Sequence, residues 1–255
     1  MSLFMDGAVL VFGGSGGMGS AIATIMGRDG SDVAFCYRNN QDAAQKVADD
    51  VAALGVKASI HAGDIGTPAD IEKIFTEAIK AHGRIHTVVI TAGSDIAQPL
   101  LNEVTEDQWR EVIDNDLNGA FKIIRTALPH FTQMGGGSFV HLSSAGILKT
   151  PPRDVLSVAP KMAIEGLIKY VAKEEGVNNI RANSIALGVI EAGIFKRLQA
   201  QGVFDAAWEE AVLAGLALKR FGDPVEVAET VSFLASNRAG YITGQLIAVD
   251  GGFHL

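Results

Sequence analysis

The sequence predicts an α/β fold, a doubly wound parallel sheet of seven strands with helices on both faces. Three observations lead to this prediction. Seven short apolar runs recur along the chain, amphipathic patterns of helical length separate them, and a glycine-rich turn follows the first run. Strands that alternate with helices are typical of a parallel sheet, because a crossover helix must bring the chain back to the starting end of the sheet.

The predicted strands are mostly continuous apolar runs, as expected for strands that helices cover on both faces. They are expected over Ala8–Phe12, Asp32–Tyr37, Lys57–His61, His86–Ile90, Ser138–Leu142, Ile180–Ile185 and Gln245–Val249.

Apolar residues spaced three and four apart predict helices over Gln41–Leu54 and Pro68–Ala81. Helix starts are marked by capping residues at three places: Thr67 before Pro68, Thr105 with Gln108, and Asp223 with Glu226.

The composition of the 255-residue chain is that of an ordinary globular protein, with 48% hydrophobic and 20% charged residues. No linker, repeat or low-complexity tract divides it, so we expect one domain over residues 1–255. The net charge of −8 disfavours nucleic acids and anionic membrane surfaces as partners, because both attract clustered Lys and Arg. The sequence shows neither a spanning apolar stretch nor a signal peptide, and we expect a cytoplasmic protein.

The single cysteine, Cys36, excludes an internal disulfide and a cysteine-based zinc site. It lies within an apolar run, which favours a buried and unreactive thiol. No metal site is predicted.

The glycine-rich turn runs from Gly13 to Gly19, between the first predicted strand and the first predicted helix. Glycines allow a tight turn and a close approach of the backbone to a pyrophosphate, which the free amides of the following helix can bind. The turn therefore predicts a dinucleotide site.

The spacing of Gly13, Gly17 and Gly19 is GxxxGxG rather than the plain GxGxxG. With the stretches Arg220–Pro224, Tyr241–Gln245 and Asp250–Gly252, the sequence resembles the short-chain dehydrogenase/reductase family. The resemblance covers almost the whole chain. It implies a single NAD(P)-binding Rossmann domain, an oxidoreductase activity on a small-molecule substrate, and a substrate-side segment at about residues 187–222.

The end of the second predicted strand favours NADP(H) over NAD(H). An acidic residue there would bind the adenosine 2′-hydroxyl, but Tyr37 is followed by Arg38 and Asn39. The guanidinium of Arg38 suits a 2′-phosphate, and Ser15 could add a hydroxyl donor.

The resemblance implies further cofactor contacts. Asp64 and Ile65 match the family's adenine-edge pair, and Ala92-Gly93 matches the end of its Asn-Asn-Ala-Gly motif. The residues expected to bind the cofactor are Gly13, Ser15, Gly17, Met18, Gly19, Arg38, Asp64, Ile65, Ala92, Gly93, Lys161, Gly188 and Val189.

The family's catalytic residues are only partly present. Ser144 and Lys161 match its Ser and Lys, whereas Ser157 stands where the family has its proton-donating Tyr, and Asp116 where it has an Asn. The candidate catalytic residues are Ser144, Lys161, Asp116, Ser157 and Asn118.

The missing Tyr changes the expected chemistry, because a serine hydroxyl is a far weaker acid than a phenol. The chain's tyrosines are Tyr37, Tyr170 and Tyr241, and the longer Tyr-to-Lys spacing of enoyl reductases leads to Asp154. The proton of an enzymatic reaction is therefore expected from Lys161, from Asp116 or from water that they hold.

Three functions remain open on the sequence. The first is an NADP(H)-dependent reductase or dehydrogenase acting on a small carbonyl or enone. The second is a C=C reductase similar to the 2,4-dienoyl-CoA reductase branch, which also lacks the Tyr and uses an acid or amide in the stretch that matches residues 116–118. The third is a cofactor-binding protein with little or no catalysis.

Three structural expectations complete the analysis. Pro160 predicts that the helix bearing Lys161 begins at about residue 160, with Ser157 in an extended or turn segment before it. Asp116 and Lys161 are expected to form a charged pair. The resemblance also implies a homotetramer or dimer, paired through the helix of Lys161 and the last strand.

Overall fold

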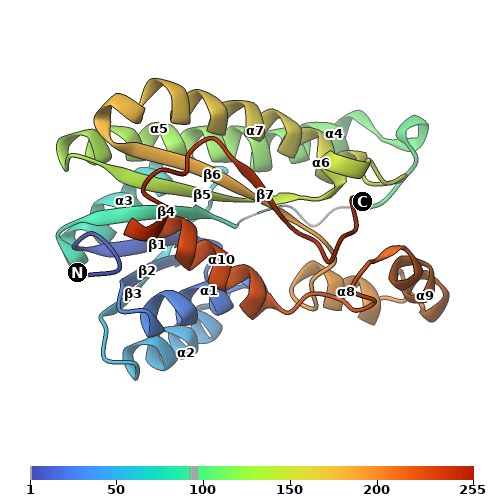
Figure 1. Cartoon of the computed structure of the whole chain (residues 1–255), viewed down its shortest axis with the longest axis horizontal. Coiled ribbons are helices and arrows are strands. Elements are labelled where there is room, and N and C mark those ends of the chain that lie inside the picture. Colours follow the sequence, from blue (N-terminus) through green and yellow to red (C-terminus); the bar gives the residue numbers. More distant parts are fainter. Residues whose placement is uncertain (1, 92, 94–96) are drawn as a thin grey trace.

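The computed structural model describes residues 2–91, 93 and 97–255, which fold around one sheet (Figure 1). Its seven strands are all parallel and lie in the order β3-β2-β1-β4-β5-β6-β7. They span Ala8–Phe12 (β1), Asp32–Tyr37 (β2), Ala58–Ala62 (β3), Ile85–Ile90 (β4), Gly137–Ser144 (β5), Ile180–Leu187 (β6) and Leu246–Val249 (β7). The predicted doubly wound Rossmann sheet is confirmed.

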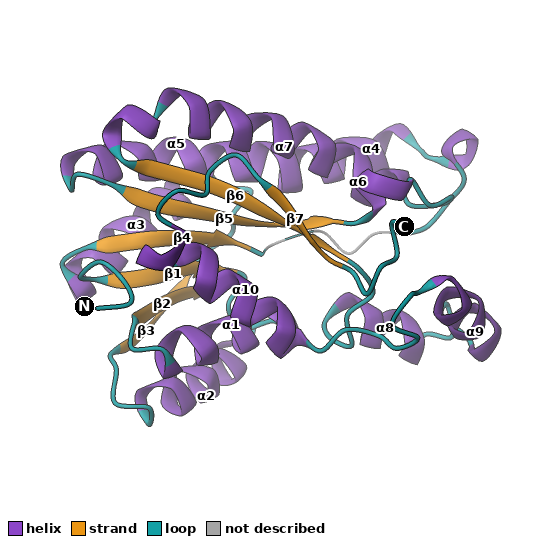
Figure 2. Cartoon of the chain, in the orientation of Figure 1, coloured by secondary structure: helices purple, strands orange, loops and turns teal. Residues whose placement is uncertain are grey.

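Helices cover both faces of this sheet (Figure 2). One layer contains α1 (Gly17–Arg28), α2 (Gln41–Ala52) and α10 (Pro224–Ala235), and the other contains α3 (Pro68–His82), α5 (Asn118–Gln133) and α7 (Val155–Glu174). The shorter helices are α4 (Glu106–Val112), α6 (Gly146–Lys149), α8 (Ile194–Ala200) and α9 (Ala206–Gly215).

The apolar side chains form a core on each face of the sheet. Strand β1 is fully buried, with Val9 and Val11 in one core and Leu10 and Phe12 in the other. This alternation follows from the twofold period of a strand whose two faces are both covered.

The strands β5 and β6 extend beyond their predicted ends. Ser143 and Ser144 continue β5 and pair with Ala186 and Leu187 of β6. The apolar run ends before these serines, so sequence patterning underestimates the strand. The extension carries Ser144 to the carboxyl edge of the sheet.

Two of the three predicted helix starts have complete capping boxes. The hydroxyl of Thr105 accepts from the Gln108 amide, while Asp223 and Glu226 exchange bonds at the start of α10. Thr67 precedes α3 without a side-chain capping bond, although Pro68 takes the first turn as expected.

The prediction for Pro160 is wrong, because α7 begins at Val155 and runs through Pro160 without interruption. The Asp154 carbonyl accepts from the amides of Ser157 and Val158 and closes the first turn. Pro160 removes only one helical hydrogen bond, and its side chain is buried with those of Leu156 and Val158. The apolar burial offsets this loss, so Ser157 is helical.

The carboxyl ends of β4, β5 and β6 point to the side of the molecule where α6, α8, α9 and the C-terminus lie (Figure 1). In open parallel sheets, ligands bind at this edge, near the point where the strand order reverses. Here the reversal lies between β1 and β4. Across the described ranges, no helix is both long and apolar enough to cross a membrane.

Candidate active site

The glycine turn between β1 and α1 is packed so closely that side chains are excluded. A Cβ on Gly14 would lie 2.3 Å from the Phe35 Cβ, and one on Gly19 would lie 2.1 Å from the Gly13 carbonyl oxygen. Gly13 itself has φ of +92°, which favours glycine. The turn therefore brings bare backbone to the edge of the sheet.

The amino end of α1 opens onto this turn. Gly16 caps the helix without any side-chain hydrogen bond, so the first amides of α1 are available to an anion. Ser15 and Met18 are half-buried beside them. A Cβ on Gly17 would lie 2.7 Å from the Gly193 amide nitrogen, so the segment after β6 closes directly over the turn. These residues fit a pyrophosphate.

A second pocket lies at the ends of β2 and β3, where an adenosine ribose is expected. Its lining residues are Arg38, Asn39, Ala62, Gly63, Asp64, Asp70 and Lys73. The Arg38 side chain is 67% exposed, with Nη1 3.9 Å from the Asp64 Oδ2. Lys73 on α3 lines the same pocket, and the sequence reasoning missed this cation. Its place beside Arg38 depends on the pairing of β2 with β3, the strand that precedes α3.

Two carboxylates in this pocket accept hydrogen bonds from backbone amides. The Asp64 amide donates to Asp70 Oδ2 at 2.9 Å, and the Gly66 amide donates to Asp64 Oδ1 at 2.8 Å. Ile65 lies between these bonds, and a Cβ on Gly119 at the start of α5 would meet it at 3.6 Å. Asp64 thus lines the pocket, whereas Ile65 packs against the start of α5.

The remaining predicted cofactor residues follow β4 and β6. Gly93 lies close to Asp116, because a Cβ added to Gly93 would be 3.8 Å from Asp116 Oδ2. Ala92 is outside the described residues. The Gly188 amide donates to the Val249 carbonyl, and the Val189 carbonyl accepts from the Gly222 amide. These bonds fix the chain as it leaves the sheet.

Ser144 ends β5, and its hydroxyl oxygen accepts a hydrogen bond from the Gly146 amide at 3.0 Å. A hydroxyl that accepts in this way still has its own proton to donate. The side chain is therefore oriented, and it can donate to a substrate oxygen.

Lys161 is positioned by α7 and approached from two sides. Its Nζ donates to the Ser157 hydroxyl at 3.3 Å and to the Ser157 carbonyl at 3.4 Å, one helical turn away. On the other side it lies 4.0 Å from Asp116 Oδ2, so the expected pair forms at the outer limit of an ion pair.

Asp116 reaches this position through a π-helical turn, Ile113–Leu117, between α4 and α5. Such turns widen a helix locally and redirect one side chain. Only 5% of the Asp116 side chain is exposed, in contrast with the acids on the outer face of α4. The structure does not bring Asn118 to Lys161, because the Asn118 amide donates to Asp114 Oδ1 at 2.9 Å.

Asp154 is a carboxyl group at this edge that the sequence reasoning did not select. It precedes α7, yet its side chain makes no capping hydrogen bond. Burial raises its pKa to about 6, and the Lys161 ammonium opposes the rise. A single signal in the sequence could have identified it, namely an acid seven residues before the Lys.

The segment after β6 carries an aromatic cluster, made of Phe195, Phe204, Trp208 and Phe221. Phe204 and Trp208 stack with ring centroids 3.8 Å apart, and Phe195 lies 5.0 Å from Phe221. The cluster joins α8 and α9 to the loop before α10. It supplies an apolar wall beyond the glycine turn.

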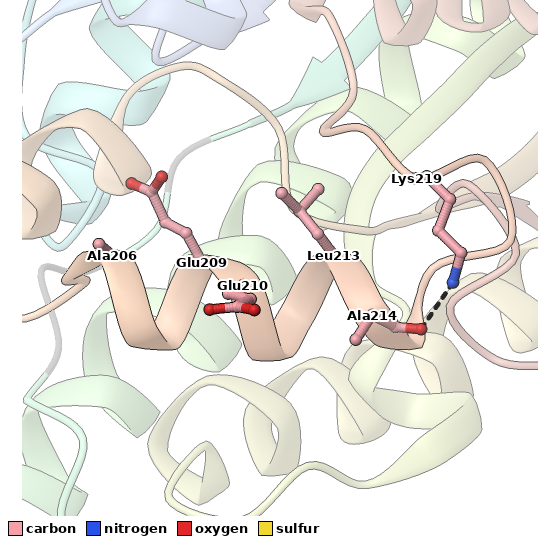
Figure 3. Close-up of a pocket in the computed structure, with 6 residues that line it drawn as sticks. All are labelled: Ala206, Glu209, Glu210, Leu213, Ala214 and Lys219. Carbon is pink, nitrogen blue, oxygen red and sulfur yellow. Dashed lines mark hydrogen bonds between the residues drawn. The ribbon is translucent and has the colours of Figure 1, made fainter.

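Helix α9 also borders an open pocket that does not include the residues above (Figure 3). Its lining combines Leu213 with the carboxylates of Glu209 and Glu210, and Lys219 donates to the Ala214 carbonyl at 2.7 Å. We assign no chemistry to it.

Comparisons with known proteins agree with this arrangement. Residues 13–254 match the family model described as "Enoyl-(Acyl carrier protein) reductase". The chain is 31% identical over 251 residues to the 3-oxoacyl-[acyl-carrier-protein] reductase FabG of Staphylococcus epidermidis, covering 98% of this chain and 100% of that protein. It is 34% identical to the FabG protein of Chlamydia muridarum, with 98% of each covered.

Solved structures are similar over nearly the full length. A short-chain type dehydrogenase/reductase from Mycobacterium ulcerans has a TM-score of 0.92 at 29% identity, covering 99% of this chain and 91% of that one. Levodione reductase has a TM-score of 0.92 at 25% identity, with 98% of each chain covered.

Proposed function

The chain belongs to the short-chain dehydrogenase/reductase family, and from this premise we propose that it is an NADP(H)-dependent oxidoreductase. It transfers hydride to or from a small organic carbonyl or enone. Membership of the family supports an oxidoreductase of the short-chain type, whereas the activity of this chain, its cofactor preference and its substrate are our proposals.

One observation carries the proposal. Ser144, Lys161 and Asp116 come from β5, α7 and the turn before α5, and they meet at the same sheet edge as the glycine turn. A hydroxyl donor, an ammonium and a carboxylate beside a dinucleotide site form the set that carbonyl chemistry needs, because charge on the carbonyl oxygen requires donors.

The preference for NADP(H) is supported by the charges at the ribose end. Arg38 and Lys73 line one pocket, and neither is held by a short ion pair there. A 2′-phosphate placed between them would gain charge-assisted hydrogen bonds from the guanidinium. NAD(H) offers only a hydroxyl at that position.

The bound cofactor would supply or accept the hydride at its nicotinamide ring. The residues of this chain then have separate tasks. The glycine turn and the start of α1 would hold the pyrophosphate, and Ser144 would donate to the substrate oxygen. Lys161 would place a positive charge at the site, beside Ser157. Asp116 fixes the Lys161 ammonium.

The substrate class follows from the relatives and from the apolar wall. The FabG relatives are named for 3-oxoacyl groups, which combine a ketone with an apolar chain. Trp208 and Phe221, the half-buried rings of the aromatic cluster, would offer such a chain an apolar surface, backed by the buried Phe195 and Phe204. We propose that the segment 187–222 is the substrate-side part of one domain that spans residues 1–255.

Binding and turnover test the proposal in two steps. NADPH fluorescence titration should show binding, and NADPH consumption should follow with a 3-oxoacyl thioester, a cyclic diketone or an enone. Turnover with enoyl or dienoyl thioesters alone would favour the C=C reductase. Binding without turnover across the panel would favour a protein that holds the cofactor without catalysis, which the absence of the Tyr makes a specific alternative.

A further inference from the structure

We propose that Asp154 is the proton donor of this site. This inference rests on the proposed reductase activity and adds to it the acid that neither Ser144 nor Ser157 can supply. Three observations carry it: the face of α7 on which Asp154 lies, the atoms that surround its carboxyl, and the lack of any other use for that carboxyl.

Asp154 shares a helix face with the two residues already placed at the site. Asp154, Ser157 and Lys161 are spaced three and four apart at the start of α7, and this spacing stacks side chains on one face. Lys161 Nζ contacts Ser157 on this face and lies 4.0 Å from Asp116 Oδ2, so the face turns toward the site. Asp154 therefore lies one turn beyond Ser157, on the side away from Lys161.

The carboxyl of Asp154 and the hydroxyl of Ser144 border the same small space beside Gly146. A Cβ added to Gly146 would lie 3.1 Å from Ser144 Oγ and 3.3 Å from Asp154 Oδ2. Any residue larger than glycine would fill this space. A substrate oxygen that accepts from Ser144 at this edge is therefore within reach of the Asp154 carboxyl.

The carboxyl has no structural task in the described part of the chain. It caps no amide of α7, and it forms no hydrogen bond or ion pair with the described residues. Among the described residues, the charged group that acts on it is the Lys161 ammonium of the same helix. The Ser144 hydroxyl of β5 borders the same space, and Asp116 lies beyond Lys161. The neighbouring Arg153 turns away, toward the Gln98 carbonyl and Glu103.

The protonation state suits an acid near neutral pH. Partial burial raises the pKa of Asp154 to about 6, so a useful fraction of the carboxyl still carries its proton at pH 7. Asp116 is held differently, because its Oδ2 lies 4.0 Å from the Lys161 Nζ.

The proposed step balances for a ketone. The carbonyl carbon receives hydride from the reduced nicotinamide and forms a C–H bond while the C=O π bond breaks. The freed electron pair on oxygen takes the Asp154 proton, with Ser144 donating to the same oxygen. The products are the alcohol, the oxidised cofactor and the Asp154 carboxylate, which regains a proton from water.

The kinetic test compares Asp154→Asn with Asp107→Asn, a matched change at an exposed acid of α4. Acetoacetyl-N-acetylcysteamine serves as the 3-oxoacyl probe. The wild type should lose turnover tenfold per pH unit above about pH 6, whereas Asp154→Asn should be about 10²–10⁴-fold slower and lack this limb. NADPH affinity should stay the same in all three proteins. Equal rates and pH profiles in Asp154→Asn and the wild type would overturn the inference while leaving the proposed function intact.

A second readout does not depend on turnover. In protein labelled with ¹³C at aspartate carboxyls, one resonance should titrate near pH 6 and be missing from Asp154→Asn. An Asp154 resonance that titrates near pH 4, as in an unfolded chain, would overturn the inference. If the protein binds NADPH but turns over none of the probes, the proposed function is wrong, and the proton-donor role of Asp154 is wrong with it.

Discussion

Arg38 follows the end of β2, with most of its side chain in solvent. Among the described residues, its nearest charged partner is the Asp64 carboxylate at 3.9 Å. Replacing it with Ala should weaken NADPH binding by about 1.5–3 kcal/mol, because a charge-assisted bond to the 2′-phosphate is lost. NADH binding should barely change. Fluorescence titration of both cofactors measures the difference, with Arg110→Ala on the surface of α4 as the control. A wild type that prefers NADH would contradict the assignment.

The raised pKa of Asp154 also affects stability, independently of any reaction. In the unfolded chain the carboxyl ionises near pH 4, whereas in the fold it ionises near pH 6. Raising the pH through this window therefore favours the unfolded state, and the loss is complete above about pH 6.

Asp154→Asn should consequently be more stable than the wild type by about 1–3 kcal/mol at pH 8, and the gain should vanish near pH 4. Urea unfolding at several pH values measures it. Asp107→Asn, at an exposed position, should show no such trend. A gain that is the same at pH 4 and pH 8 would show that Asp154 has an ordinary pKa.

At the residue scale, sequence reasoning placed residues correctly where their position depends on local spacing. Gly13, Gly19 and Ser144 were selected from short motifs, and each occupies the edge where the motif requires it. Lys73 was not selected, because its place beside Arg38 arises from elements that are remote in sequence. The spacing to Lys161 pointed to Asp154, but its burial and its position near Ser144 arise only from the fold. Asn118 shows the reverse error, since its position in a motif does not reveal that its amide is held by Asp114.

Among the elements, α7 shows why propensity alone misplaced a helix start. The expectation that a proline ends or begins a helix considers only local effects, namely one lost hydrogen bond and the contact of the ring with the preceding turn. It does not include the burial of Leu156, Val158 and Pro160 against the rest of the protein, which holds the first turns of α7 in place. Because α7 is continuous, Ser157 lies in phase with Lys161 and Asp154 lies one turn further on.

The contact between α6 and α7 depends on Gly146, and we predict that Gly146→Ala disturbs the site. An alanine Cβ would lie 2.6 Å from Val158 Cγ2 and 3.1 Å from Ser144 Oγ. The protein should lose about 1–3 kcal/mol of stability and most of its turnover, because overpacking forces the two helices apart. NADPH binding should persist, since the glycine turn is elsewhere.

The matched control is Gly215→Ala, at the end of helix α9, where an added Cβ would meet no atom within 4 Å. Alanine favours a helix over glycine by up to about 1 kcal/mol, so this variant should be equally or more stable. Urea unfolding and NADPH-consumption assays of both variants provide the comparison. Equal activity of Gly146→Ala and the wild type would argue against a tightly packed Ser144–Asp154 region.

On the scale of the whole molecule, the isolated chain leaves a sheet edge and apolar surface exposed. Strand β7 ends the sheet with an unpaired edge, and Met162 and Tyr170 on α7 are 43% and 67% exposed. Unpaired strands and apolar patches are commonly covered by a second subunit. We predict a homotetramer built on two-fold axes through α7 and β7. Light scattering at micromolar concentration checks this, and a monomer would refute it.

The central claim, hydride transfer between NADP(H) and a carbonyl or enone, is tested most directly with NADPH deuterated at C4 of the nicotinamide. The protein is mixed with acetoacetyl-N-acetylcysteamine and with the diketone and enone probes, and the products are examined by mass spectrometry and NMR. Our account predicts one deuterium on the former carbonyl carbon, or on a former alkene carbon, for each NADPH consumed. Tight NADPH binding with no deuterium in any product would contradict it.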